Sequence, residues 1–202
     1  MRPAVFLDRD GVLIQDVHLL ARPEQIVVLP GVVAALRNLS AAGFHLFVVS
    51  NQPVVARGLA TEADVASVHT ELQRQLTAAG GPVLRRFYFC PHHPNATLPQ
   101  YRVACDCRKP RPGMLLQAAR DYAVDLRASF AVGDRITDII AGARAGCRTI
   151  LVQTGMHTQP PIETAEPLDV SVQPDFTCAG LPAAAAWILS QAGTGQAAAK
   201  EK

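Results

Sequence analysis

The stretch A-V-F-L-D-R-D-G at residues 4 to 11 decides the fold of this 202-residue chain. Four successive apolar residues indicate a strand buried on both faces, and the charged residues after them indicate a polar turn. Asp8 and Asp10 are two positions apart as the chain leaves the strand, so both carboxylates are expected to face one cleft while Arg9 points elsewhere. Gly11 permits a sharp turn behind them. The competing interpretation is an acidic turn at the surface.

Strands and helices are predicted to alternate after this first strand. Further short apolar strands are expected over residues 46–49, 86–89, 130–132, 150–152 and 175–177. Helices are expected over 32–39 and 61–76, from about residue 112, after residue 134 and around 181–189. Helical crossovers imply parallel pairing, so the predicted fold class is α/β, a three-layer, doubly wound, mostly parallel sheet. Ligands of such sheets bind beyond the carboxyl ends of the strands.

Composition is that of one soluble domain. Hydrophobic residues make up 49% of the chain and aromatic residues 5%, which favours an aliphatic core over residues 1–192. Residues 193–202 offer little to bury and are expected to be a mobile tail. The early charges leave no signal-peptide core, and no apolar run is long enough for a membrane span. A cytoplasmic protein with no membrane partner is therefore expected.

A cysteine-rich loop spans residues 90 to 107. It carries C-P-H-H-P at 90–94 and C-D-C at 105–107, so Cys90, His92, Cys105 and Cys107 form a Cys₃His set suited to tetrahedral Zn²⁺. Paired spacings place alternate side chains on one side of an extended segment. Two alternatives are reduced free thiols, and His93 as the ligand in place of His92. Four protein ligands leave no open position, so such a zinc ion would brace the loop.

Four short motifs in order resemble those of the haloacid-dehalogenase-like (HAD) phosphatase superfamily. They are F-L-D-R-D-G-V at 6–12, Ser50 in V-V-S-N-Q, Lys109 in C-R-K-P, and Asp134 with Asp138 in G-D-x-x-x-D. The resemblance implies a Mg²⁺-dependent phosphoric monoester hydrolase with an aspartyl-phosphate intermediate on Asp8. It also implies an acid and base role for Asp10, and magnesium ligands from the Asp8 and Asp134 carboxylates and the Asp10 carbonyl.

Elementary chemistry agrees with these roles. A phosphoryl group in transfer carries negative charge, which calls for a hard cation, a fixed ammonium and hydroxyl donors. Oxygen ligands select Mg²⁺ over softer ions. Other interpretations remain open here: Lys109 as a solvated surface charge, Ser50 as a helix cap, and Asp138 either as a support for the metal or as a solvated residue.

The cysteine-rich loop resembles that of one particular group within this superfamily. C-P-H-H-P followed by C-D-C-R-K-P-x-P-G-M is similar to the cap-less D-glycero-D-manno-heptose 1,7-bisphosphate 7-phosphatases, whose product enters lipopolysaccharide, and to the related histidinol-phosphatases. The likeness runs from about residue 4 to about residue 190. It implies a monomer acting on a small phosphorylated metabolite, with substrate contacts from Asn51, Gln52, Arg57 and Arg108. Pro53, Val54 and Val55 depart from the Ser-Gly pair common in that group.

Two other functions compete with heptose bisphosphate hydrolysis. Histidinol phosphate or another small phosphate ester would use the same chemistry. A zinc-containing nucleic-acid-binding module is the alternative of a different class, because Arg85, Arg86, Arg108, Lys109 and Arg111 lie close in sequence. A net charge of +2, few aromatic residues and several carboxylates argue against a nucleic-acid partner.

Overall fold

The computed structural model describes residues 1–156, 158, 167–169 and 171–198. The strands are β1 (Ala4–Leu7), β2 (His45–Asn51), β3 (Arg86–Cys90), β4 (Phe130–Gly133), β5 (Arg148–Val152) and β6 (Phe176–Cys178). The α-helices are α1 (Val32–Ala41), α2 (Pro53–Ala56), α3 (Glu62–Ala78), α4 (Gly113–Tyr122), α5 (Ile136–Ala145) and α6 (Leu181–Ala198). This alternation confirms the predicted α/β class.

All six strands pair in parallel in one sheet with the order β3-β2-β1-β4-β5-β6. The chain winds from β1 to β3 on one side and from β4 to β6 on the other. The direction of winding therefore reverses between β1 and β4. Their carboxyl ends form the topological switch point at which doubly wound sheets bind ligands.

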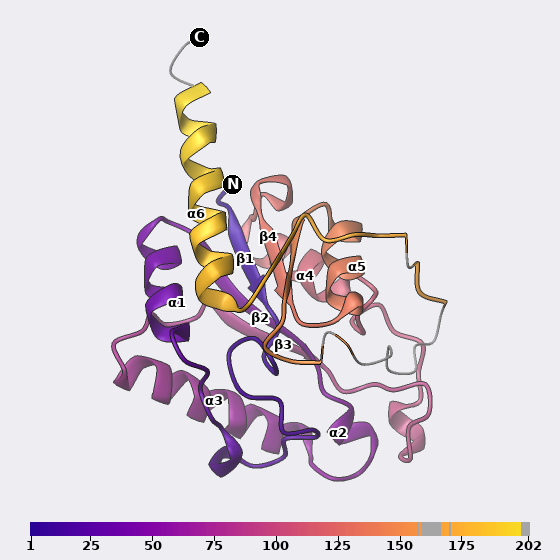
Figure 1. The fold of residues 1–202 in the computed structure, drawn as a ribbon. Helices are drawn as coiled ribbons and strands as arrows, with labels where there is room; N and C mark the ends of the chain where they lie inside the picture. Colours follow the sequence, from indigo (N-terminus) through magenta and orange to yellow (C-terminus); the bar gives the residue numbers. More distant parts are fainter. Residues whose placement is uncertain (157, 159–166, 170, 199–202) are drawn as a thin grey trace.

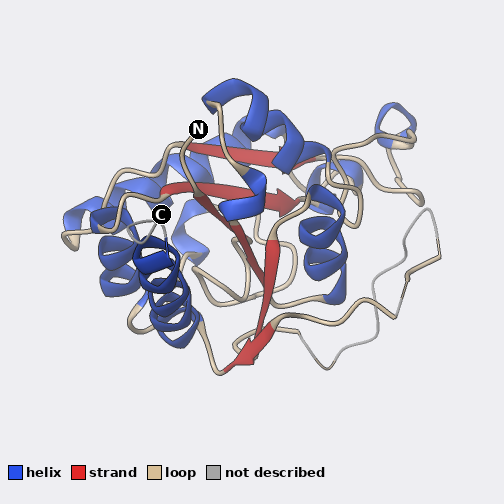
Figure 2. Cartoon of the chain, turned by 90° about the horizontal axis from the view of Figure 1, so that it is seen from above, coloured by secondary structure: helices blue, strands red, loops and turns tan. Residues whose placement is uncertain are grey.

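Helices cover both faces of the sheet and give the three predicted layers (Figures 1 and 2). Apolar side chains of α1, α3 and α6 pack on one face, and those of α4 and α5 pack on the other. Strand β1 feeds both cores, because Val5 and Leu7 join the first while Ala4 and Phe6 join the second. All four are fully buried, and each large apolar side chain contributes about 1.5–3 kcal/mol.

Local sequence signals explain several element boundaries. Helix α3 begins with a capping box, since Asp64 N donates to Thr61 Oγ1 at 3.1 Å and Thr61 N donates to Asp64 Oδ2 at 2.8 Å. Helix α2 was not expected. Pro53 occupies its first turn, where a missing N–H leaves no helical hydrogen bond unmade.

Helix α6 is longer than expected and runs through Ala198. The segment that was expected to be a mobile tail thus begins inside this helix, and residues 199–202 lie outside the described residues. In the described part of the chain, no helix has both the length and the apolar character that crossing a bilayer requires.

Candidate active site

Side chains from separate strand ends meet in one pocket. Asp8 directly follows β1, Ser50 lies near the end of β2, and Asp134 directly follows β4. Most of the predicted site residues line this pocket, namely Asp8, Asp10, Ser50, Asn51, Gln52, Arg57, Arg108, Lys109 and Asp138. Asp134 joins them from the floor, because its carboxylate lies within 4.8 Å of those of Asp8 and Asp138.

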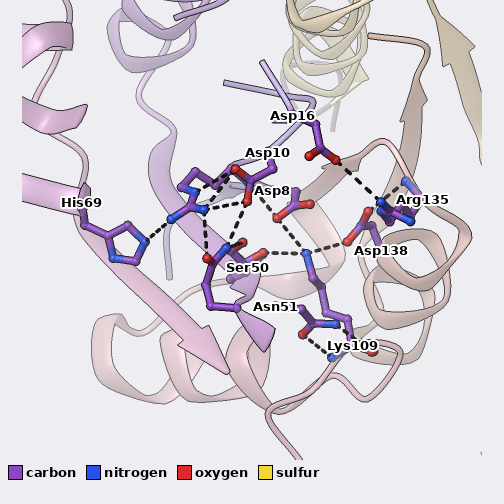
Figure 3. A network of polar contacts seen from close by, with 12 residues as sticks. Asp8, Asp10, Asp16, Ser50, Asn51, His69, Lys109, Arg135 and Asp138 are labelled. Atoms are coloured by element: carbon purple, nitrogen blue, oxygen red, sulfur yellow. Dashed lines mark hydrogen bonds and ion pairs between the residues drawn. The ribbon is translucent and has the colours of Figure 1, made fainter. Parts of the chain in front are cut away.

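Lys109 supplies the cation at the base of the pocket (Figure 3). Its Nζ lies 3.0 Å from Asp8 Oδ1 and 2.6 Å from Asp138 Oδ1, and donates to the Val49 carbonyl at 2.8 Å. Burial lowers the pKa of Lys109, but the Asp138 and Asp8 carboxylates outweigh this and raise it above its ordinary value. A side chain that is 3% exposed is not a solvated surface charge, so that interpretation is wrong.

Asn51 fixes the backbone that carries this lysine. Its Nδ2 donates to the Lys109 carbonyl and its Oδ1 accepts from the Lys109 N–H, both at 3.0 Å. Asn51 was predicted to contact substrate. Both ends of its amide are occupied by Lys109 here, so its observed contacts hold the lysine across the gap between β2 and the cysteine-rich loop.

The three carboxylates of Asp8, Asp134 and Asp138, called the carboxylate cluster below, are buried together. Asp134 Oδ2 accepts from the Met156 N–H at 2.6 Å. Gly11 packs against this carboxylate so closely that a Cβ there would lie 2.6 Å from Oδ2. Asp138 Oδ2 accepts from the Arg135 N–H at 3.0 Å, which caps α5, so a solvated Asp138 is excluded.

The carboxylate cluster fits a hard divalent cation. Three acidic groups face one ammonium, and burial, together with the Asp138 and Asp8 charges, raises the pKa of Asp134 to about 8. Asp134 Oδ1 is buried and has no hydrogen-bond partner. An uncompensated negative charge with a free carboxylate oxygen is what an oxygen-ligated Mg²⁺ requires. The predicted ligands Asp8 and Asp134 are therefore well placed, and Asp138 is held mainly by Lys109.

Arg9 does not point elsewhere, which corrects the expectation from strand alternation. Its guanidinium folds back onto the Asp10 carboxylate, with Nη2 2.8 Å from Oδ2 and Nε 3.2 Å from Oδ1. The turn after β1 breaks strict alternation: Gly11 has φ 76°, and its N–H donates to the Ile14 carbonyl. The Asp10 carboxylate thereby points away from the carboxylate cluster, as Figure 3 shows.

Ser50 presents a hydroxyl to the pocket. Its Oγ accepts from Gln52 Nε2 at 2.8 Å, so its own proton is left to donate to an anion. Gln52 also donates to Asp10 Oδ2 at 3.0 Å and accepts from Arg9 Nη2 at 2.9 Å. Gln52, which was predicted to contact substrate, lines the pocket, and its observed contacts connect the two strand ends.

Two further guanidinium groups, those of Arg57 and Arg108, line the pocket. Arg108 is 8% exposed, donates to the His92 carbonyl at 3.0 Å, and has a buried Nε with no hydrogen-bond partner. Burial lowers the pKa of Arg108, and the positive charge of Arg57 lowers it further. On another wall, Arg135 Nη2 lies 3.6 Å from Asp16 Oδ2. The predicted residues Arg57 and Arg108 thus place two positive charges near each other at the pocket.

The four predicted zinc ligands come together beside this pocket. Cys90, His92, Cys105 and Cys107, called the thiol cluster below, have donor atoms all within 4.8 Å of one another. Cys90 Sγ lies 3.6 Å from Cys105 Sγ and 3.7 Å from His92 Nδ1. His93 lies outside the cluster and accepts from the Asn95 N–H. Hydrogen bonding with Cys90 lowers the pKa of Cys107 to about 5, which supplies a thiolate. Soft donors in this arrangement fit Zn²⁺.

Sequence reasoning missed three contributors to the site. Arg9 was visible as the residue between the two aspartates, but strand alternation misplaced it. His69 lies in the buried stripe of α3 and reaches Arg9, so a histidine among apolar helix positions was an available signal. Nothing in the sequence pattern marked Met156, whose backbone N–H holds Asp134.

The sequence is similar to those of known phosphatases. A family model described as HAD-hydrolase-like matches residues 106–184. The chain is 44% identical over 145 residues to a D-glycero-beta-D-manno-heptose-1,7-bisphosphate 7-phosphatase of Rhodopseudomonas palustris, covering 72% of this chain and 80% of that protein. It is 42% identical to the D-glycero-D-manno-heptose-1,7-bisphosphate 7-phosphatase of Thermosynechococcus vestitus, covering 94% and 96%.

Solved structures agree with these relatives. A crystal structure of D,D-heptose 1,7-bisphosphate phosphatase from B. bronchiseptica, complexed with magnesium and phosphate, matches with a TM-score of 0.77 at 35% identity over 94% of this chain and 99% of that one. The corresponding enzyme from Burkholderia thailandensis matches with a TM-score of 0.62 at 28% identity. The chain therefore belongs to the HAD-like hydrolases, in the family of the heptose bisphosphate phosphatases, and is a phosphoric monoester hydrolase.

Proposed function

We propose that this phosphatase removes the 7-phosphate of D-glycero-D-manno-heptose 1,7-bisphosphate through a phosphoryl group held on Asp8. The Asp8 carboxylate attacks phosphorus, the phosphorus–oxygen bond of the ester breaks, and Asp10 gives its proton to the departing alkoxide. Water then loses a proton to Asp10 and displaces Asp8 from phosphorus, which releases phosphate. Asp8, Asp10, Ser50 and Lys109 carry these steps.

The position of Lys109 is the observation that carries this proposal. A buried ammonium held between Asp8 and Asp138 can neutralise charge on a transferring phosphoryl group without first being desolvated. Ser50 offers a second donor on the next strand end. Mg²⁺, held by the Asp8 and Asp134 carboxylates and the Asp10 carbonyl, would supply the remaining positive charge.

The Arg57 and Arg108 guanidinium groups that line the pocket favour a substrate with a second anion. Arg108 has a buried donor without a partner, and Arg57 lies close enough to shift its pKa. An anionic group bound between them would relieve this repulsion, as a second phosphate of a bisphosphate would. Histidinol phosphate would bring an ammonium instead. The bisphosphate is therefore the better match, in keeping with the names of the relatives.

A nucleic-acid-binding role is disfavoured by where the basic residues lie. Arg85 and Arg86 stand at the start of β3, whereas the cysteine-rich loop follows its carboxyl end. Lys109 is buried in ion pairs and Arg108 is buried against His92. These residues do not form one exposed basic patch. A small phosphorylated metabolite is the proposed partner.

The thiol cluster is proposed to hold one structural Zn²⁺. Its four donors fill a tetrahedral shell and leave no position for substrate. The loop that it would fix leads directly from Cys107 into Arg108 and Lys109. The zinc ion would thereby hold two pocket cations in place without taking part in bond making.

The remaining features of the proposal concern the state of the protein. Residues 1–192 are taken as one catalytic domain, because all six described strands share one sheet. Free cysteines suit the reducing cytoplasm, where thiolates are available to bind metal. Scattered exposed apolar side chains, such as Leu59 and Val83, favour a monomer. Size-exclusion chromatography with light scattering tests the last point.

A phosphate-release screen tests the proposed substrate. Purified protein with Mg²⁺ is expected to release phosphate from heptose 1,7-bisphosphate faster than from histidinol phosphate or heptose 7-phosphate. Arg57→Met should raise the KM for the bisphosphate about tenfold and leave that for the 7-phosphate nearly unchanged, because only the former carries the second anion. Equal rates on all three esters would contradict the bisphosphate assignment.

A further inference from the structure

Arg9 is a buried guanidinium that the proposed reaction does not use. It is 0% exposed, and it is among the largest fully buried side chains of the protein. A buried charge is costly unless it is paired and hydrogen-bonded. The groups that Arg9 contacts therefore indicate why the protein tolerates it.

One set of contacts joins Arg9 to the Asp10 carboxylate. Nη2 lies 3.0 Å from Oδ1 and 2.8 Å from Oδ2, and Nε lies 3.2 Å from Oδ1. Gln52 Nε2 makes a fourth contact with this carboxylate and donates to Oδ2 at 3.0 Å. The Asp10 side chain, still 22% exposed to the pocket, is thus fixed in one orientation by donors on its inner side.

A second set of contacts fixes Arg9 from behind. Its Nη1 lies 3.5 Å from His69 Nε2, and its Nη2 donates to Gln52 Oε1 at 2.9 Å. The His69 ring stacks on Phe87 with centroids 4.9 Å apart. Burial lowers the pKa of His69 to about 3, with Arg9 adding to the effect, so a neutral ring accepts from the guanidinium. Figure 3 shows the chain of contacts from His69 to Asp10.

We propose that Arg9, braced by His69 and Gln52, is a positioning residue that holds the Asp10 carboxylate oriented to take a proton from water. This inference rests on the proposed function of Asp10. In the second step a water O–H bond breaks, its proton goes to an Asp10 oxygen, and the water oxygen bonds to phosphorus. The phosphorus–Asp8 oxygen bond then breaks and its electron pair returns to the Asp8 carboxylate. A guanidinium fixed beside Asp10 keeps the accepting carboxylate in place for this step.

A double-mutant cycle tests the proposal. With an alkyl phosphate substrate, Arg9→Met is expected to lower kcat by about 10²-fold with little change in KM, because it loses only the orientation of the base. In an Asp10→Asn background the same change should lower kcat by less than about twofold, since Arg9 acts through Asp10. If the kcat losses of the two single variants multiply in the double variant, the proposal is overturned and Arg9 has a structural role alone.

The step affected provides a readout that loss of stability would not move. 4-Nitrophenyl phosphate has a good leaving group and needs little acid assistance in the first step. Arg9→Met should therefore release one equivalent of nitrophenolate per active site in a burst. Slow turnover should follow, because phosphorylated Asp8 is hydrolysed slowly when the base is not oriented. A steady slow release without a burst would contradict a role in the second step.

Two further variants keep the test decisive. Arg74→Met removes an exposed guanidinium from an ion pair with Glu71 on the helix that carries His69, and should leave kcat unchanged. Arg9→Lys keeps the charge and replaces Arg9→Met if that variant does not fold, with an intermediate kcat expected. If Asp10→Asn stays fully active, the proposed function of Asp10 fails. If Asp10→Asn is inactive but Arg9→Met matches the wild type, only the positioning role fails.

Discussion

The carboxylate cluster and the thiol cluster are both suited to a metal ion, but they are built in different ways. The thiol cluster draws all four donors from an 18-residue loop, Cys90 to Cys107. The carboxylate cluster joins Asp8 to Asp134 and Asp138, which are 126 and 130 positions away along the chain. One cluster organises a loop, whereas the other depends on a completed sheet.

The two clusters also differ in their charge balance. Thiols can share protons when no ion is bound, as the lowered pKa of Cys107 beside Cys90 indicates. Among the described residues, Lys109 is the cation in ion-pair contact with the crowded carboxylates, and Asp134 keeps a buried oxygen without a hydrogen-bond partner. The carboxylate cluster thus holds unfavourable negative charge that a bound cation would relieve, whereas the proposed zinc ion would stabilise the loop that carries the thiol cluster.

The largest effect is expected from Asp8→Asn, which removes the proposed nucleophile from the carboxylate cluster. Turnover should fall by about 10⁴-fold or more, because no covalent intermediate can form, while the circular dichroism spectrum stays that of the wild type. Phosphate-release assays measure the turnover, and thermal melts check that the fold is retained. Asp121→Asn, which alters a carboxylate bonded to Tyr88 outside the pocket, is the control and should retain full turnover. Substantial activity in Asp8→Asn would show that another residue attacks phosphorus.

The next effect is expected from Cys105→Ser, which breaks the thiol cluster. Zinc content by elemental analysis should fall from near one per chain toward zero, with about 4 kcal/mol of unfolding free energy lost. Cys178→Ser changes a cysteine outside the cluster and should keep its zinc. A wild-type chain that is free of zinc yet equally stable would rule out the bracing role.

An effect of opposite sign is expected from Asp134→Asn. Without divalent cations this variant should be more stable than the wild type at pH 7.5 by on the order of 2–3 kcal/mol, because burial and the neighbouring carboxylates, which raise the pKa of Asp134, disfavour its charged form in the folded protein. Added Mg²⁺ should raise the melting temperature of the wild type but not that of Asp134→Asn. Asp175→Asn, outside the pocket, serves as the comparison. If Asp134→Asn melts lower than the wild type in EDTA, the carboxylate cluster is not electrostatically strained.

The smallest effect concerns pH. The folded pKa of His69, lowered to about 3 by burial and Arg9, lies below its unfolded value near 6.5. Its contribution is therefore complete above pH 6.5 and is lost as the pH falls, by about 2 kcal/mol at pH 5. Denaturant unfolding of wild type and His69→Gln at pH 7.5 and 5 isolates this contribution from the carboxylates, which are common to both. The exposed His18→Gln should keep the wild-type difference, and an equal loss in all three chains would mean that His69 is not the group responsible.

The sequence alone determined the features that short-range chemistry controls. Buried strands such as Ala4–Leu7 were predictable because four successive apolar residues followed by charged residues are typical of a strand that ends at a polar turn. The thiol cluster was equally visible, since its spacing places donors on one side of nearby extended segments. Parallel pairing then followed from alternating helices, and it predicted which strand ends would share an edge.

Only the tertiary structure decided how the side chains at that edge are partnered. Strand alternation predicted that the Arg9 side chain points away from that of Asp10, but the turn at Gly11 brings the two side chains together. Asn51 and Gln52 were predicted to contact substrate; both line the pocket, and their hydrogen bonds to Lys109 and Asp10 were not predicted. These contacts join residues on different strands and helices, and a buried polar group takes whichever partner the packed core leaves within reach. The spacing of residues in the sequence does not indicate which partner that is.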